Sequence, residues 1–134
     1  MSAHQLDDAK TATVAGAHGR DIGKTFTILE VGPLDMSGFV LRLVAALRVE
    51  SYTGLLEQLN SVKDGAPLDA IMQVLRGSDP QAVHALVREA LDYVHITPDP
   101  KHPGVLRPLL ANDVRELKTL GEILMAFAKL NLGT

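Results

Sequence analysis

The chain lacks cysteine and tryptophan, and aromatic residues make up only 4% of its 134 residues. Without cysteine it can form neither a disulfide nor a thiolate metal site, which fits a reducing compartment such as the cytoplasm. So few aromatic side chains argue against a stacking platform for single-stranded nucleic acid. The 46% hydrophobic content, mostly aliphatic, is nevertheless enough for the core of one domain.

Long apolar runs and a dominant charge are also missing. No run approaches the roughly 20 residues that a membrane-spanning helix needs, and residues 1–20 lack the basic start and apolar middle of a signal peptide. The net charge is −3, with acidic and basic residues interspersed, whereas nucleic-acid binders usually carry a basic field. The sequence therefore predicts a cytoplasmic protein that binds neither nucleic acid nor membranes.

The N-terminal part of the chain contains the best strand signal. Residues 1–22 show no apolar periodicity and are interpreted as a flexible arm, so the domain is expected to span residues 23–134. Residues 24–31 combine partial alternation with β-branched and aromatic side chains, which favours a strand that ends at Gly32-Pro33. Its partner is either a weak hairpin arm at residues 12–14 or a second subunit, which would make a homo-oligomer.

The rest of the chain is dominated by helical periodicity. A capping signal at Asp79-Pro80 and an apparent capping box from Thr119 to Glu122 support two of the helices, and four prolines in residues 97–108 predict an extended loop. The expected fold is mainly α, a small multi-helix domain with a short N-terminal β-strand or hairpin. The predicted helices cover residues 35–50 (capped by Asp35), 53–62, 67–77, 79–95 and a last segment that begins near residue 112.

Residues with catalytic or metal-binding chemistry do not form a recognisable motif. His95, Asp99 and His102 match no metal-ligand spacing, and their interpretation as solvated side chains is favoured. Gly23-Lys24-Thr25 echoes a phosphate-binding loop, but the preceding glycine is at the wrong distance and a strand follows instead of a helix. We therefore predict no catalytic residue, no metal site and no cofactor, and a protein that is not an enzyme.

Two apolar helical stripes are the candidate partner-binding surface. A contiguous apolar patch on a protein surface commonly marks an interaction site, although the interpretation that both stripes simply form the core is favoured for most of these residues. The tentative partner-binding residues are Phe39, Val40, Leu43 and Leu47 in the first helix, and Leu120, Leu124 and Phe127 in the last.

Two stretches carry a family resemblance: GKTFTILEVGPLDMSGFVLRLVAALR at residues 23–48 and LLANDVRELKTLGEILMAFAKLNLG at residues 109–133. In this order they resemble tail assembly chaperones encoded in tail gene clusters of siphophage-like and myophage-like prophages. The resemblance implies a protein of the bacterial host cytoplasm that binds the helical tape-measure protein, assists assembly of the tail tube subunits, and is absent from the finished particle. The alternative is a structural tail protein or a head–tail connector or completion protein, which would remain in the particle.

Overall fold

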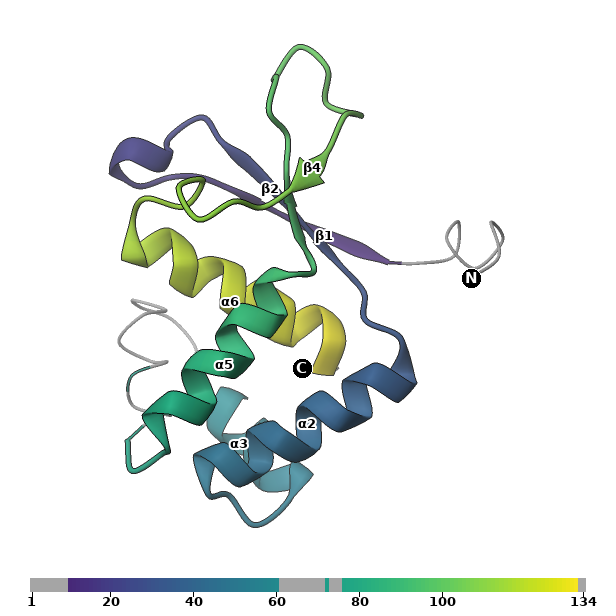
Figure 1. Cartoon of the computed structure of the whole chain (residues 1–134), viewed down its shortest axis with the longest axis vertical. Helices are drawn as coiled ribbons and strands as arrows, with labels where there is room; N and C mark the ends of the chain where they lie inside the picture. The colour runs from purple at the N-terminus through teal and green to yellow at the C-terminus, as the bar shows by residue number, and fades with distance from the viewer. Residues whose placement is uncertain (1–9, 61–71, 73–75, 133–134) are drawn as a thin grey trace.

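The structure is a computed structural model that describes residues 10–60, 72 and 76–132. Four strands, one 3-10 helix and several α-helices make up the described part of the chain (Figure 1). In chain order they are β1 (Thr11–Ala15), η1 (Gly19–Asp21), β2 (Thr25–Leu29), α2 (Pro33–Leu47), α3 (Tyr52–Asn60), α5 (Pro80–Leu91), β3 (Val94–Ile96), β4 (Arg107–Pro108) and α6 (Leu117–Leu132).

The strands form one antiparallel sheet in the order β1-β2-β3-β4. Thr13 pairs with Thr27, Thr27 with His95, and His95 with Pro108, so these residues form one row across the sheet. Because neighbouring residues of a strand point to opposite faces, the side chains of this row lie on one face of the sheet. The apolar residues next to them in each strand lie on the other face.

The predicted mainly α fold is wrong, because the chain is a mixed α/β protein built around this sheet. Strand β1 pairs with β2, which confirms the hairpin arm predicted at residues 12–14, and regular structure is therefore already present at Thr11 within the stretch interpreted as a flexible arm. Strand β3 lies where the predicted fourth helix was extended to residue 95, and β4 falls in the proline-rich loop. Strands β3 and β4 were not predicted because they are short and depend on their neighbours for stability, whereas helical periodicity is visible within one segment.

The helix boundaries confirm some signals and correct others. Asp79 caps α5 as predicted, because its Oδ1 accepts hydrogen bonds from the backbone N–H groups of Gln81 and Ala82. Helix α2 begins at Pro33 after Gly32, and no side chain caps it, so Asp35 does not have the predicted role. Thr119 is buried inside α6 and does not form a capping box there. Most of the predicted helix at residues 67–77 lies outside the described residues.

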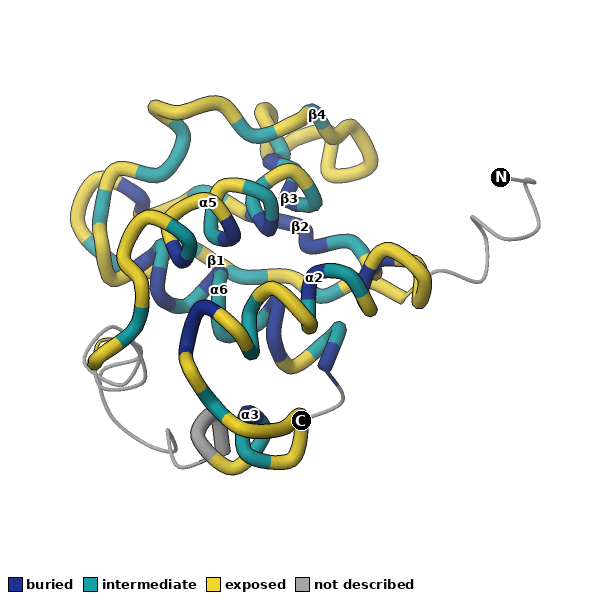
Figure 2. Tube along the Cα trace, turned by 60° about the horizontal axis from the view of Figure 1, so that its bottom comes forward, coloured by how far each residue is buried: buried dark blue, intermediate teal, exposed yellow. Residues whose placement is uncertain are grey.

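The helices lie together on one side of the sheet (Figure 1), and buried residues occur on both the strands and the helices that pack against them (Figure 2). Strands β1 and β2 contact α6, while α2 packs against α5. Phe26, Ile28 and Val94 are almost completely buried on the helix-facing side of the sheet. The alternation at residues 24–31 predicts that Phe26 and Ile28 share one side of the strand, and the structure shows that this side faces the core. No helix in the described part of the chain is long and apolar enough to cross a membrane.

Candidate partner-binding surface

The tentative partner-binding residues lie mainly in the core or at its margin. Phe39, Leu47 and Phe127 are buried, and the rings of Phe39 and Phe127 meet edge to face with centroids 5.4 Å apart. The other four are half-buried. Three of them pack against the core: Val40, Leu43 and Leu124. The fourth, Leu120, lies at a surface depression. The two predicted stripes therefore meet each other in the interior, and only their margins reach the surface.

One such margin borders an apolar depression between α2 and the C-terminal end of α6, which we call the α2–α6 groove. Its volume is about 480 Å³, and among its lining residues only Glu30 carries a charge. Val40 is the tentative partner-binding residue that lines it. The remaining lining residues are Val31, Pro33, Met36, Ser37, Leu41, Tyr52, Leu130, Asn131 and Leu132.

Two hydrogen bonds hold the walls of the α2–α6 groove together. The Asn131 side-chain oxygen accepts from the backbone N–H of Val31 at 2.7 Å, which ties the end of α6 to the chain that enters α2. The Tyr52 hydroxyl donates to the Leu132 carbonyl at 2.6 Å, which ties α3 to the same helix end. Segments distant in sequence therefore form one surface, and the groove is fixed by contacts that no local sequence pattern reveals.

Helix α2 also presents apolar side chains to solvent beside this groove. Leu34 is 86% exposed and Leu41 is 72% exposed, and a spacing of seven residues places them two turns apart on one side of the helix. The small residues Ser37 and Gly38 lie between them. Sequence reasoning missed these leucines because it followed the broader stripe through Phe39 and Leu43. Two leucines seven residues apart on another side of the helix were the available signal.

A second depression, the α5–α6 groove, lies between α5 and the start of α6. Its volume is about 490 Å³, and Leu120 lines it. Leu110 and Leu117, both in its lining, are 62% and 67% exposed. The remaining lining residues include charges of both signs: His84, Arg88, Leu91, Asp92, Leu109, Ala111, Val114, Arg115 and Glu116. This groove is therefore more polar than the α2–α6 groove.

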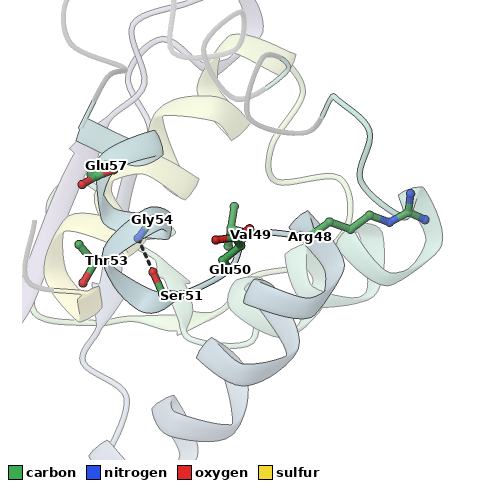
Figure 3. Close-up of a pocket in the computed structure, with 7 residues that line it drawn as sticks. All are labelled: Arg48, Val49, Glu50, Ser51, Thr53, Gly54 and Glu57. Carbon is green, nitrogen blue, oxygen red and sulfur yellow. Dashed lines mark hydrogen bonds between the residues drawn. The ribbon is translucent and has the colours of Figure 1, made fainter.

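A third depression, between α2 and α3, is lined mainly by polar residues (Figure 3). Arg48, in the left-handed conformation with φ 58°, ends α2, and its side chain extends away from the other side chains. The Ser51 hydroxyl accepts a hydrogen bond from the Gly54 backbone N–H at 3.0 Å, which is a helix-start contact. Glu57 lies at the opposite side of the view from Arg48. These groups do not converge on a common point, as acid–base catalysis would require.

The histidines considered as metal ligands are separated by the fold. His95 lies on strand β3, while the His102 ring Nδ1 lies 2.9 Å from Asp99 Oδ2 in the following loop. Hydrogen bonds from the Lys101 backbone and from His102 lower the pKa of Asp99. Among the described residues, no cluster of three or more histidine or carboxylate side chains could hold a metal ion.

The most highly connected polar group is Asp21, whose side chain is fully buried in the loop between β1 and β2. Its carboxylate accepts hydrogen bonds from the backbone N–H groups of Arg115 and Glu116, just before α6, and from the Lys24 ammonium at 3.0 Å. Lys24 also donates to the Asp113 carbonyl at 2.8 Å. We call these five residues the Asp21 junction. It joins the N-terminal hairpin to the start of the last helix.

The environment of Asp21 favours its charged form. Burial raises the pKa of Asp21, but hydrogen bonds from the Arg115 backbone, the Lys24 side chain and the Glu116 backbone, together with the nearby Thr119 side chain, more than offset this, and the pKa falls to about 2. Such a carboxylate stays ionised at neutral pH and is a poor general acid or base. The Asp21 junction therefore has the properties of a structural tie.

The fold and surface define an α/β module whose most prominent exposed feature is apolar, with polar clusters that serve internal contacts. Comparisons with known proteins give no match: no model of a protein family, no curated protein and no solved structure matches the chain. The surface of the molecule and the resemblance described above are therefore the grounds on which a function can be proposed.

Proposed function

We propose that this chain is a tail assembly chaperone of a bacteriophage or prophage that holds an apolar helical segment of the tape-measure protein in the host cytoplasm. The observation that carries the proposal is the α2–α6 groove, which is mostly apolar and bordered by the exposed Leu34 and Leu41. An apolar surface of this kind commonly binds a partner. The family resemblance supports the choice of partner.

The shape of the surface suits a helical occupant. An amphipathic helix binds a groove through anchors at positions i, i+3, i+4 and i+7, and Leu34 and Leu41 offer complementary contacts about 10 Å apart along α2. The border is acidic, with Glu30 in the lining and Asp35 in the first turn of α2. A helix that presents apolar anchors flanked by basic residues would complement this surface. Bound in this way, it would be shielded from aggregation until the tail tube subunits assemble around it.

The proposal includes two further statements. The protein would not be an enzyme, which agrees with the polar clusters at Asp21 and Asp113 serving internal ion pairs and backbone contacts. It would also be absent from the finished particle, which separates it from the alternative of a structural tail, connector or completion protein. Mass spectrometry of purified particles distinguishes the two, since only a structural component remains in a mature tail.

The direct test is co-expression with the tape-measure protein encoded in the same gene cluster, followed by affinity purification. The wild-type chain should keep that protein soluble and co-purify with it. Leu34→Asp and Leu41→Asp place a charge in the apolar contact, and we expect at least a tenfold loss of co-purified protein. Because both side chains are mostly exposed, the variants should keep the wild-type circular dichroism spectrum and unfolding midpoint.

Two matched variants control for the apolar-to-acidic change. Leu117→Asp alters the α5–α6 groove, and Ile22→Asp alters an equally exposed residue, 68% exposed, in the loop between β1 and β2. Both should co-purify the tape-measure protein as the wild type does. If Leu41→Asp binds normally while Leu117→Asp does not, the partner occupies the α5–α6 groove instead. If the wild-type chain neither keeps the tape-measure protein soluble nor binds it, the proposed chaperone function is wrong.

A further inference from the structure

The two edges of the sheet are protected to different degrees. Strand β4 has only two residues, and one of them, Pro108, has no backbone N–H to offer a further strand. The other, Arg107, is held in a two-bond ion pair with Asp113 at 2.7 and 2.8 Å. Strand β1, at the opposite edge, is a regular strand with the sequence Thr-Ala-Thr-Val-Ala. It has neither proline nor a charged residue, the devices that usually prevent edge pairing.

The hydrogen bonds of the hairpin show which backbone groups of β1 face outward. The Glu30 N–H donates to the Lys10 carbonyl at 3.1 Å, and the Gly16 N–H donates to the Lys24 carbonyl at 2.8 Å. In an antiparallel ladder the bonded residues alternate, so the even-numbered residues of β1 bond to β2. The N–H and C=O groups of the odd-numbered residues therefore point away from the sheet: Thr11, Thr13 and Ala15. No described residue pairs with them.

This edge is complementary to itself. A two-fold axis perpendicular to the sheet at Thr13 pairs Thr13 with the Thr13 of a second copy and Thr11 with Ala15. In this arrangement the backbone hydrogen bonds between the two copies form between the residues whose N–H and C=O groups point outward. The residues between them, Ala12 and Val14, would lie opposite each other on the helix-facing side. They are only half-buried in one chain, so the second copy would cover apolar surface that is now exposed.

The geometry points to a second copy of this chain as the occupant of the β1 edge, giving a dimer with one continuous eight-stranded sheet. Such isologous pairing is a common form of two-fold dimer, and backbone hydrogen bonds supply much of the affinity when a strand is added to an edge. No like charges meet along β1. Helix α6 of each copy lies on the same side of the joined sheet, because α6 covers that face of β1 and β2. The inference is independent of the chaperone function.

The molar mass of the full chain, measured by sedimentation velocity across a dilution series, tests the dimer. We expect a species of twice the 14.4 kDa chain mass that dissociates on dilution. Thr13→Pro removes an outward N–H while leaving the hydrogen bonds to β2 intact, and it should halve the molar mass. Thr13→Lys, at an exposed position, places two like charges opposite each other at the axis and should have the same effect without changing the backbone.

The matched control is Thr25→Lys, which adds the same charge at an exposed position on the same sheet face but on the inner strand β2. It should remain dimeric. Single cysteines give a second measurement, because the chain has none of its own. Across the proposed axis two copies of Cys at position 13 would have Cα atoms about 5.5 Å apart, within disulfide range. Copies at position 25 would be about 20 Å apart, since three strand spacings separate them across the sheet and about four residues separate them along the strands, and they should not cross-link.

Each outcome decides the inference. A wild-type chain that is monomeric at every concentration overturns it. A wild-type dimer that survives both Thr13→Pro and Thr13→Lys places the interface elsewhere and also overturns it. If Thr13→Pro fails to fold, Thr13→Lys settles the question, because a folded monomer supports the dimer at β1 and a folded dimer refutes it. Partner binding is unaffected in the expected case, so failure here leaves the chaperone test intact.

Discussion

The two ends of helix α6 are attached to the molecule in opposite ways. At its N-terminal end, the fully buried Asp21 binds two backbone N–H groups and an ammonium group. At its C-terminal end, the Leu132 carbonyl accepts one hydrogen bond from Tyr52, and Asn131 binds the Val31 backbone. The first end is held by charge and the second by two neutral hydrogen bonds around apolar side chains.

Because of this difference, we expect one end of α6 to contribute mainly to the stability of the fold and the other mainly to partner binding. A buried carboxylate needs several donors, so the Asp21 carboxylate is satisfied entirely by internal hydrogen bonds. The C-terminal end leaves apolar surface uncovered in the α2–α6 groove. We therefore expect changes at the first end to alter the free energy of unfolding and changes at the second end to alter mainly partner binding.

We expect the largest change in the free energy of unfolding when the buried carboxylate of Asp21 is removed. Asp21→Ala leaves the Lys24 ammonium and the backbone N–H groups of Arg115 and Glu116 without their acceptor. Because unsatisfied buried donors are costly, it should lower the free energy of unfolding by about 3 kcal/mol. Chemical denaturation followed by circular dichroism measures this change. The control is Asp79→Ala, which removes an exposed helix cap and should cost only about 1 kcal/mol. Equal losses would mean that burial adds nothing at Asp21.

The second effect is steric and arises next to the Asp21 junction. A Cβ on Gly16 would lie 1.9 Å from the Asp21 carbonyl oxygen, so the loop between β1 and β2 must shift to accept it. Gly16→Ala should therefore lower the free energy of unfolding by about 2 kcal/mol. Gly38→Ala in α2 is the matched control, because no atom lies within 4 Å of its Cβ. It should raise stability by roughly 0.5 to 1 kcal/mol. Thermal unfolding of both variants decides the sign.

A smaller effect depends on pH. The pKa of Asp21 is about 2 in the folded chain against an ordinary value of 3.8. A lowered pKa stabilises the fold above the ordinary value, and this contribution is lost as the pH falls toward the folded value. The difference in unfolding free energy between wild type and Asp21→Asn should therefore be constant above about pH 5 and shrink between about pH 4 and pH 2. Urea denaturation at several pH values measures it.

The same comparison removes the influence of neighbouring acids. Arg107 lowers the pKa of Asp113, and Arg20 lowers the pKa of Glu116. Both carboxyls titrate in wild type and in Asp21→Asn, so their contributions largely cancel in the difference. A difference that stays constant down to pH 2 would contradict the lowered pKa of Asp21.

The smallest expected effect tests the C-terminal end of α6. Tyr52→Phe removes the hydrogen bond to the Leu132 carbonyl, but the ring is 44% exposed and water can replace the hydroxyl. The free energy of unfolding should fall by no more than about 1 kcal/mol. Co-purification with the tape-measure protein should weaken more clearly, because Tyr52 lines the α2–α6 groove. If Tyr52→Phe lowers the free energy of unfolding as much as Asp21→Ala does, the C-terminal end of α6 contributes to stability as much as the N-terminal end, and the proposed difference between the two ends is wrong.

Much of the helical structure could be predicted because its signals are local. The Asp79-Pro80 start of α5, and the placement of Phe26 and Ile28 on one side of a strand, were predicted from neighbouring residues alone. The same reasoning placed a capping box at Thr119, where the structure has a buried helical residue beside Asp21. That error has a physical reason: the backbone just before α6 donates to a carboxylate 94 residues earlier in the chain, and no local pattern can contain this contact.

The sequence by itself determined which segments are amphipathic, where α5 begins, and that no cysteine chemistry takes part. It did so because helix periodicity and capping depend on residues a few positions apart. Only the tertiary structure decided that β1, β3 and β4 join β2 in a sheet, that Phe39 and Phe127 pack together in the core, and that Leu34 and Leu41 stay exposed. Strand pairing and burial are relations between distant segments, so they become definite only when the chain is folded.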